Sequence, residues 1–241
     1  MRDRPGHWIS LFSGGKDSAW ALYRALEREL AVSRLVTVHP GADSYLYHVP
    51  ATDLTALAAE SIGIPVLDVY PGDLDATSAT DAGTQGDAEL VPLEAALSAL
   101  DVELDGGVRG VIAGAIESEF QTSRIEAMCD RLGADLFAPL WGADPGTLGR
   151  EMIAAGFESR IVAVAAAGLD EHWLGRTLDE QALVELEALH ERYGVHVLGE
   201  GGEFETIVTD GPHMEQPIRF EATTVWDGMR GHLQITDAWL A

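Results

Sequence analysis

The sequence predicts an α/β protein with a doubly wound, parallel sheet of five strands, followed by a second, smaller α/β domain. Short apolar runs alternate with segments of helical periodicity five times between residues 8 and 141. This alternation is typical of parallel strands joined by right-handed helical crossovers. Residues 218–226 and 232–240 instead alternate apolar and polar side chains, which indicates antiparallel strands. We therefore predict two domains, residues 1–140 and residues 141–241.

The first domain divides into strands and helices at its apolar runs. Strands are expected over residues 8–12, 34–40, 64–70, 109–116 and 134–141. Helices are expected over residues 17–30, 53–62, 88–103 and 118–133, where apolar residues recur at helical spacing. Asp53 is expected to cap the second of these helices. The polar, glycine-rich residues 72–87 are expected to form a loop.

The second domain is expected to contain helices over residues 143–156 and 179–193, with a strand-like stretch over residues 157–168 between them. In doubly wound sheets, ligands bind at the carboxyl ends of the parallel strands. The segments expected to line the site are therefore residues 13–18, 39–48, 71–87 and 114–124.

Acidic residues dominate the composition. The chain of 241 residues has a net charge of −25 and a pI of about 4.4, and its carboxylates are spread along its whole length. Such a surface is typical of a halophile-like protein, because in high salt carboxylates stay hydrated and their mutual repulsion is screened. The sequence shows no basic patch, which argues against nucleic acid as the main partner.

Cysteine content and apolar run lengths narrow the class further. Cys129, the only cysteine, rules out an internal disulfide and a Cys-x-x-Cys pair, and we expect it to be a buried hydrophobic residue. Trp20 and Trp141 are expected in the core rather than in an aromatic cage for a quaternary ammonium. The apolar runs are too short to cross a membrane, and the N-terminus lacks a signal peptide. We expect a cytoplasmic protein without a membrane partner.

A polar turn, Ser-Gly-Gly-Lys-Asp-Ser, joins the first expected strand to the first helix. A glycine-rich turn that opens a helix suits phosphate, because the helix N-terminus offers unpaired N–H groups and a partial positive charge. Lys16 is the only lysine among 15 basic residues, which favours a chemical role for its compact, flexible charge. The residues expected to bind the nucleotide here are Ser13, Gly14, Gly15, Lys16, Asp17 and Ser18.

This turn differs from the common phosphate-binding motifs. Asp17 stands where a Walker A loop has Ser or Thr, and Phe204 replaces the last glycine of a Gly-x-Gly-x-x-Gly pattern. The turn instead resembles the PP-loop of the ATP pyrophosphatases, in the adenine nucleotide alpha-hydrolase superfamily. The resemblance implies a Rossmann-like (HUP-type) fold and ATP, with Mg²⁺, cleaved between its α and β phosphates. Lys16 would then stabilise the leaving pyrophosphate. Asp17 is expected to orient Lys16 or reach Mg²⁺, or merely to favour the helix N-terminus.

Further stretches resemble one branch of that superfamily. They are YLYHVP (45–50), GAIESEFQTSRIEAMC (114–129), APLWG (138–142) and GEGGEFETIVTDGP (199–212). Their order and spacing, from about residue 8 to residue 212, are similar to those of the diphthine–ammonia ligase family. The resemblance implies that the carboxylate of diphthine, a modified histidine on translation elongation factor 2, becomes an acyl-adenylate, and that ammonia then displaces AMP. Some larger eukaryotic relatives have extra C-terminal domains that this sequence does not show, so we expect free ammonium to be the nitrogen source.

Three glutamates of the last motif are candidates for chemistry. Ammonia must be neutral to attack, so a carboxylate near the acyl-adenylate can take a proton from ammonium. Glu203 and Glu205 share one face of an extended chain, and crowding raises the pKa of neighbouring carboxylates. We expect Glu203 and Glu205 to be catalytic and Glu200 to bind substrate. Alternatively, these carboxylates bind Mg²⁺ or the trimethylammonium group of diphthine, or form an ordinary acidic turn.

Other candidate residues follow the second and fourth expected strands. Gly114 is expected at the nucleotide. Arg124 and Gln121 lie one helical turn apart; either Arg124 contacts a phosphate or the substrate carboxylate and Gln121 a nearby polar group, or Arg124 forms a surface salt bridge. His48 is expected to bind substrate or to pack within its own loop. No set of protein ligands for a metal is predicted.

Two other functions stay open. One is an RNA-modifying PP-loop enzyme, such as a tRNA-thiolating or lysidine-forming one, although the single cysteine and the acidic surface argue against it. The other is a nucleotide-binding module without turnover, although the intact Lys16 and Asp17 argue against it. The sequence leaves the oligomeric state open, a homodimer included.

Overall fold

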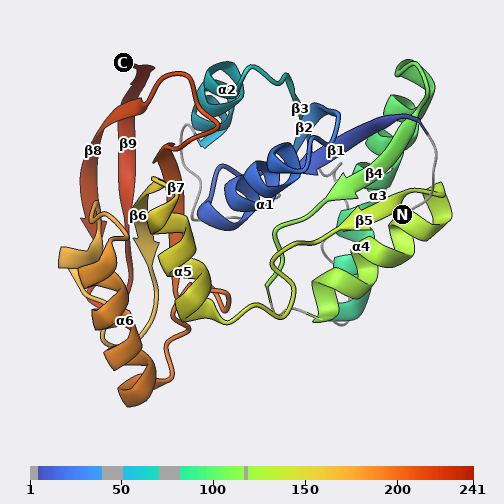
Figure 1. Cartoon of the computed structure of the whole chain (residues 1–241). Helices are drawn as coiled ribbons and strands as arrows, with labels where there is room; N and C mark the ends of the chain where they lie inside the picture. Colours follow the sequence, from blue (N-terminus) through green and yellow to red (C-terminus); the bar gives the residue numbers. More distant parts are fainter. Residues whose placement is uncertain (1–4, 40–50, 71–81, 117–118) are drawn as a thin grey trace.

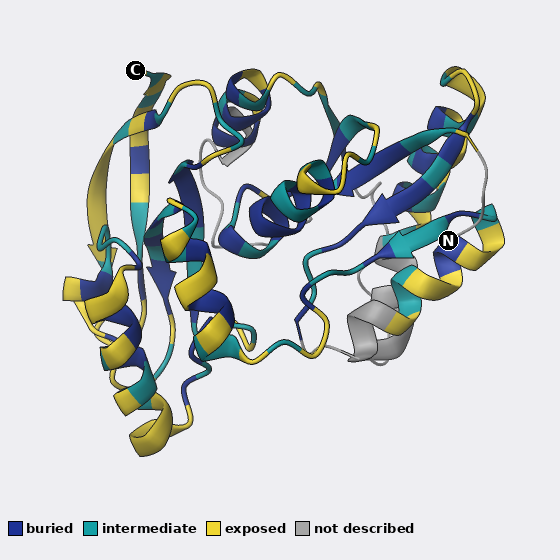
Figure 2. Cartoon of the chain, viewed as in Figure 1, coloured by how far each residue is buried: buried dark blue, intermediate teal, exposed yellow. Residues whose placement is uncertain are grey.

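The computed structural model of the chain describes residues 5–39, 51–70, 82–116 and 119–241, without the side chains of residues 51–53, 82–89 and 119–122. Within this part, two sheets lie side by side, with helix α1 (Lys16–Glu27) between them (Figure 1). Buried residues are concentrated in α1 and in the strands on either side of it (Figure 2).

The first sheet is the predicted parallel, doubly wound sheet. Its strands are β1 (His7–Leu11), β2 (Val32–Val38), β3 (Val66–Val69), β4 (Val108–Ile112) and β5 (Asp135–Phe137), in the order β3-β2-β1-β4-β5. All four pairings are parallel. The direction of winding reverses between β1 and β4, so the chain after β1 and the chain after β4 open a crevice at their carboxyl ends.

Helices cover both faces of this sheet. They are α1, α2 (Ala51–Ile62), α3 (Ala82–Glu103) and α4 (Glu119–Leu132). Leu22 of α1 and Ala58 of α2 belong to one buried apolar cluster, whereas Leu97 of α3 and Met128 of α4 belong to another. Alternate residues of a strand belong to different clusters. Trp8 of β1 belongs to the first cluster, and the next residue, Ile9, belongs to the second.

Three sequence predictions about these elements are wrong in detail. Helix α2 begins at Ala51, so Asp53 lies inside its first turn and is not its N-cap. Residues 82–87, expected in a loop, form the start of α3, which is long enough to hold Pro92 inside it. Trp141, expected in the core, is 43 % exposed, whereas Trp20 and Cys129 are buried as predicted.

The second sheet is antiparallel, as expected for the C-terminal segments. Its strands are β6 (Glu158–Val164), β7 (Phe204–Asp210), β8 (Ile218–Trp226) and β9 (Gly231–Leu240), in the order β7-β6-β9-β8. It is accompanied by α5 (Pro145–Ala154), the short 3-10 helix η1 (Glu171–Trp173) and α6 (Glu180–Tyr193). Asp144 and Asp179 cap α5 and α6, because each carboxylate accepts a backbone N–H of the first turn at 2.8 Å. The domain boundary near residue 140 stays a prediction.

An aromatic cluster joins α1 to the second sheet. The rings of Trp20 and Tyr23 on α1 make edge contacts with Phe157, which follows α5. The ring of His213 stacks on Phe157, with centroids 5.1 Å apart. This packing holds α1 against the segments that precede β6 and follow β7.

None of the helices in the described part of the chain is long and apolar enough to span a bilayer.

Candidate functional site

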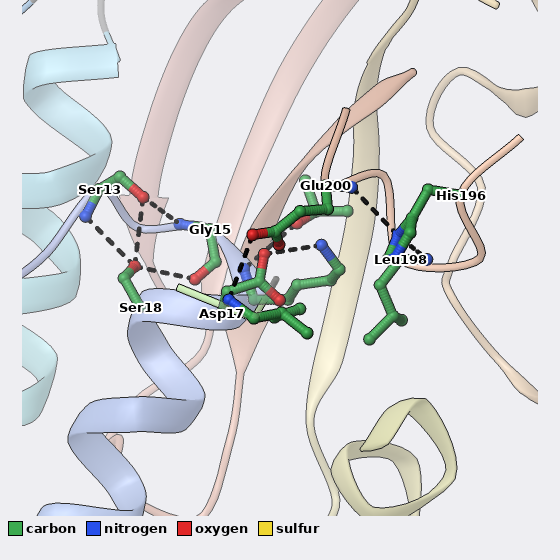
Figure 3. Close-up of polar contacts among 10 residues, drawn as sticks. Ser13, Gly15, Asp17, Ser18, His196, Leu198 and Glu200 are labelled. Carbon is green, nitrogen blue, oxygen red and sulfur yellow. Dashed lines mark hydrogen bonds and ion pairs between the residues drawn. The ribbon is translucent and has the colours of Figure 1, made fainter. Parts of the chain in front are cut away.

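The predicted phosphate turn connects β1 to α1 and is held by its own serines (Figure 3). The Oγ of Ser18 donates to the carbonyl of Gly15 at 3.0 Å and accepts the N–H of Ser13 at 3.2 Å. Gly14 has φ +80°, a backbone conformation that glycine adopts without strain. The turn is therefore preformed, with its backbone N–H groups and hydroxyls gathered at the start of a helix.

The start of α1 also touches the second sheet. The N–H of Val208 in β7 donates to the carbonyl of Gly14 at 2.9 Å, and the N–H of Lys16 donates to Oγ1 of Thr206 at 3.2 Å. A Cβ on Gly15 would lie 3.2 Å from the carbonyl oxygen of Thr206, so the contact is close. The phosphate turn thus lies between the two sheets and is held by both.

Lys16 is 3 % exposed, which is rare for lysine. Its Nζ donates to Oδ2 of Asp17 at 2.8 Å and lies 5.5 Å from the ring centroid of Phe204 in β7. Among the described residues Lys16 thus has one carboxylate partner and an aromatic face, which leaves donor hydrogens of the ammonium for an anion such as phosphate.

Asp17 is the most perturbed carboxylate of this site. Burial raises its pKa, Lys16 opposes the rise, and the negative charge of Glu200 adds to it. The Oδ1 atom is buried without a hydrogen-bond partner among the described residues. A buried carboxylate oxygen of this kind is suited to bind a cation.

An open pocket of roughly 380 Å³ lies beside the turn, at the carboxyl ends of β1, β2 and β4. Val36 and Val38 line its apolar side, and Ser13, Asp17 and Glu200 are among its polar lining residues. Its position at the reversal of winding and its volume are typical of small-ligand sites. Gly114 lines it too.

Glycine is required at position 114. A Cβ there would lie 2.7 Å from the carbonyl carbon of Asp17 and 2.8 Å from the backbone nitrogen of Ser18. The chain after β4 therefore passes against the first turn of α1 at a distance that only glycine allows. This contact brings the predicted residue Gly114 to the same pocket as the phosphate turn.

Residues 196–203 form a loop that carries Glu200 into the site. Oε1 of Glu200 accepts the N–H of Ile116, beyond β4, at 3.1 Å (Figure 3). The Nδ1 atom of His196 accepts the N–H groups of Leu198 and Glu200, each at 3.2 Å. Because Nδ1 is an acceptor, the proton of the neutral ring resides on Nε2.

Glu203 and Glu205 have different surroundings. Oε1 of Glu203 accepts the N–H of His196 at 3.0 Å, which closes the loop on itself. Its Oε2 is buried without a hydrogen-bond partner among the described residues. Glu205 lies in β7 opposite Ala163 and lines a separate pocket with His232. The catalytic roles of both glutamates stay predictions.

The remaining candidates are only partly placed. Arg124 is half-buried on α4, one residue before Ile125, which lines the pocket. His48 and the side chain of Gln121 lie outside the described residues. The segments 39–48 and 71–87, expected to line the site, also fall largely outside them.

Sequence reasoning missed two residues of the site, His196 and Thr206. Both act through contacts with segments far away in the chain or with backbone groups, and no local motif marks such contacts. The available signal was the glycine-rich motif 199–212, which contains Thr206 and begins three residues after His196.

A metal site built from protein ligands alone is not present in the described residues, where no group of three or more histidine, cysteine or acidic side chains is arranged to hold an ion. Mg²⁺ in nucleotide sites is usually held by one or two carboxylates, phosphates and water. The single buried oxygen of Asp17 fits that mode of binding.

Comparison with known proteins decides the family. The model of the diphthamide synthase N-terminal domain matches residues 6–136, and that of the diphthamide synthase C-terminal domain matches residues 144–240. The chain belongs to the diphthamide synthase family. The resemblance inferred from the sequence motifs is therefore confirmed.

Curated relatives agree with this assignment. A diphthine–ammonia ligase of Danio rerio is 35 % identical over 228 residues, covering 89 % of this chain and 86 % of the relative. The human protein of that name is 33 % identical over 227 residues, covering 90 % and 83 %. The diphthine–ammonia ligase of Saccharomyces cerevisiae is 31 % identical, and the match covers 86 % of this chain but 33 % of the yeast protein. A solved structure described as a predicted subunit of tRNA methyltransferase from Methanocaldococcus jannaschii has a TM-score of 0.44 and 17 % identity, over 86 % of this chain and 98 % of that one.

Proposed function

We propose that this protein amidates diphthine on translation elongation factor 2, using ATP and ammonium and releasing AMP and pyrophosphate. Support comes from membership of the diphthamide synthase family and from the name diphthine–ammonia ligase borne by its curated relatives. The observation that carries the proposal is the buried Lys16 at the N-terminus of α1, paired with Asp17 beside the pocket.

In the first step, a carboxylate oxygen of diphthine attacks the α-phosphorus of ATP. The bond between that phosphorus and the bridging oxygen breaks, and pyrophosphate leaves. Negative charge grows on the leaving group, and the ammonium of Lys16 would stabilise it. Arginine is a rigid fork and does not follow this shift of charge as lysine does.

Mg²⁺ would neutralise phosphate charge during this step when it is bound. The Oδ1 of Asp17 is the atom that would hold it, since it is buried and has no hydrogen-bond partner among the described residues. Its other oxygen, Oδ2, already accepts from Lys16 at 2.8 Å. One carboxylate thus holds the lysine and leaves one oxygen for the ion.

In the second step, ammonia attacks the acyl carbon and AMP leaves with the oxygen it shared with that carbon. Ammonium must first lose a proton to become neutral ammonia, and Glu203 is our candidate for accepting this proton. Its buried Oε2 has no hydrogen-bond partner in the described structure, and it lies three residues from Glu200, which faces the nucleotide pocket. The protein is expected to be cytoplasmic.

The test of this proposal measures the amide product. Elongation factor 2 that carries diphthine is incubated with the protein, ATP, Mg²⁺ and ¹⁵N-ammonium in high salt, and the modified peptide is analysed by mass spectrometry. We expect one ¹⁵N atom to enter the peptide as an amide. Omitting ATP, or using Lys16→Ala, removes the signal. Glu203→Gln is expected to keep ATP binding and lose the amide.

Two results contradict the proposal. If the diphthine peptide stays unchanged while ATP is consumed with a transfer RNA substrate, the protein belongs with the RNA-modifying enzymes of the superfamily. If ATP binds without turnover on any substrate, the protein is a nucleotide-binding module.

A further inference from the structure

Strand β7 contacts Lys16 at two points. Phe204 and Thr206 project from the same face of the strand, because side chains alternate between the two faces. The ring centroid of Phe204 lies 5.5 Å from Nζ of Lys16, and Oγ1 of Thr206 accepts the backbone N–H of Lys16 at 3.2 Å. One strand of the second sheet therefore contacts both the charge and the backbone of the residue proposed to stabilise pyrophosphate.

The hydroxyl of Thr206 acts as a cap for α1. Gly15 stands at the N-cap and has no side chain that could accept an N–H of the first turn. Threonine is one of the residues that commonly supply this acceptor, yet here it comes from 190 positions further along the chain. A Cβ on Gly15 would lie 3.2 Å from the carbonyl oxygen of Thr206, so a larger residue at the N-cap would crowd the strand. The start of α1 thus depends on β7 for its cap.

Capping uses only part of what this hydroxyl offers. A threonine hydroxyl accepts through its lone pairs and also donates one hydrogen. The N–H of Lys16 takes a lone pair, and the hydrogen of Thr206 has no acceptor among the described residues. Thr206 is partly exposed, so a ligand can reach it. The hydrogen is therefore available to an anion that binds at the same end of α1.

The neighbouring groups indicate which part of a nucleotide this anion is. Lys16 supplies a buried positive charge, and the N-terminus of α1 adds a partial positive charge. Both favour phosphate. The apolar wall of the nucleotide pocket comes instead from Val36 and Val38 of β2, which suit a base. The hydroxyl of Thr206 is thus placed for the phosphates and not for the base.

We propose that Thr206 is a further phosphate-binding residue of the ATP site. Its hydroxyl accepts the N–H of Lys16 and donates to an oxygen of the pyrophosphate part of ATP. This inference rests on the proposed function, since it takes the phosphate turn as the place where ATP is held. The phosphate site is then complete only with β7 in place, so the second sheet takes part in binding ATP.

The binding test compares ligands that contain different parts of ATP. Affinities for ATP, AMP and pyrophosphate are measured by calorimetry with Mg²⁺ at constant KCl. Thr206→Val keeps the shape of the side chain without its hydroxyl. We expect it to bind pyrophosphate and ATP about tenfold or more weakly, the loss of a hydrogen bond to a charged group. AMP binding is expected to be unchanged, because AMP lacks the pyrophosphate part. Thr206→Ser keeps the hydroxyl and is expected to bind all three ligands as wild type does.

Thr209→Val is the matched control. Thr209 lies buried in the same strand, and its hydroxyl donates to the carbonyl of Glu158 at 3.1 Å. This variant is expected to lower the melting temperature without changing the affinity for pyrophosphate. AMP binding shows that each variant is folded. If Thr206→Val does not fold, Thr206→Ala is compared with Thr206→Ser in its place.

Four results overturn the proposal. Unchanged pyrophosphate affinity of Thr206→Val would show that the hydroxyl does not touch phosphate, and a higher affinity would show that it occupies the place of a phosphate oxygen. Equal losses for AMP and pyrophosphate would show that Thr206 only holds the turn. A loss in Thr206→Ser as large as that in Thr206→Val would show that the hydroxyl is not the group that matters.

Turnover separates this inference from the proposed function. If pyrophosphate binding depends on Thr206 but the diphthine-bearing factor is never amidated, the proposed function fails and the phosphate contact stands. If the factor is amidated while Thr206→Val binds pyrophosphate as wild type does, the inference fails alone. If wild type binds neither ATP nor pyrophosphate, both fail.

Discussion

Glu200, in the loop before β7, and Ile116, just after β4, are joined by a hydrogen bond of 3.1 Å, from the N–H of Ile116 to the carboxylate of Glu200. This bond brings a negative charge from residues 196–203 to the pocket beside Asp17, whose pKa that charge helps to raise. The bond therefore couples the position of the loop to the electrostatics of the phosphate turn.

Replacing Glu200 separates these two effects. Glu200→Gln keeps an oxygen that accepts the N–H of Ile116 but removes the charge, whereas Glu200→Ala removes both. We expect Glu200→Ala to lower the kcat/KM for ATP by about tenfold or more, the loss of a hydrogen bond to a charged group. Glu200→Gln is expected to lie between Glu200→Ala and wild type. Identical activity of all three proteins would show that the bond has no part in turnover.

Lys16 is expected to be irreplaceable. Lys16→Ala removes the charge beside the leaving pyrophosphate, and we expect turnover to fall by more than about 100-fold, the typical loss for a donor that stabilises a transition state. Lys16→Arg keeps the charge, but the larger, rigid guanidinium does not fit a position that is 3 % exposed. Turnover of both variants is measured as steady-state AMP release. The control is Arg28→Lys, which exchanges one basic side chain for another elsewhere on the chain. Near-normal turnover of Lys16→Arg would show that charge alone suffices.

His196 is expected to position Glu200 through the backbone. Its Nδ1 accepts two N–H groups of the loop, and the side-chain oxygen of asparagine can accept in a similar place. We therefore expect His196→Ala to raise the KM for ATP and His196→Asn to restore most of the affinity. If His196→Asn restores no affinity for ATP, the imidazole has a direct chemical role. The pH dependence of kcat should then differ between wild type and the variant.

The stability of the fold is expected to depend on His213. Burial lowers its pKa from 6.5 to about 4, so between these values the unfolded chain binds the proton more tightly than the folded one. Stability from this group is complete above pH 6.5 and is lost as the pH falls towards 4. The loss amounts to roughly 3 kcal/mol at most.

The variant His213→Phe tests this dependence. Phenylalanine keeps the stack on Phe157 and removes two ring nitrogens that have no hydrogen-bond partner among the described residues. Chemical unfolding of both proteins between pH 4 and pH 7 should show that the free energy of unfolding of the variant rises relative to that of wild type as the pH falls. A constant difference across that range would contradict the assignment.

Salt is expected to stabilise the protein as a whole. A net charge of −25 on 241 residues repels itself, and the screening length shortens from about 10 Å at 0.1 M salt to about 3 Å at 1 M. The melting temperature should therefore rise steadily with KCl. Sucrose at matched osmolality controls for general exclusion effects, and a melting temperature that is flat in KCl would contradict a halophile-like adaptation.

The fold was predictable because its strands are short apolar runs, and the order of strands and helices leaves few topologies. The errors lie where local sequence and tertiary packing disagree. Residues 82–87 contain glycine and polar side chains typical of a loop, yet they extend α3. Trp141 is large and aromatic, yet it lies in the turn after β5 and not in the core.

The site was predictable only where a motif is local. The turn of Lys16 and Asp17 carries its own signal in glycines and a helix start. The contact of Thr206 with the N–H of Lys16 spans 190 positions, and the role of His196 rests on backbone hydrogen bonds. The Thr206 contact forms only when the second sheet packs against α1. The hydrogen bonds of His196 are local, but they go to backbone N–H groups, which no side-chain motif marks.

The central claim is that Lys16 and Asp17 serve ATP cleavage between the α and β phosphates for a carboxylate substrate. The most direct measurement follows ATP labelled at the α-phosphate, with Mg²⁺, ammonium and diphthine-bearing elongation factor 2, omitting each in turn. We predict labelled AMP only when the factor is present, and none with Lys16→Ala. Label that stays in ATP, or that appears as ADP, would contradict the account.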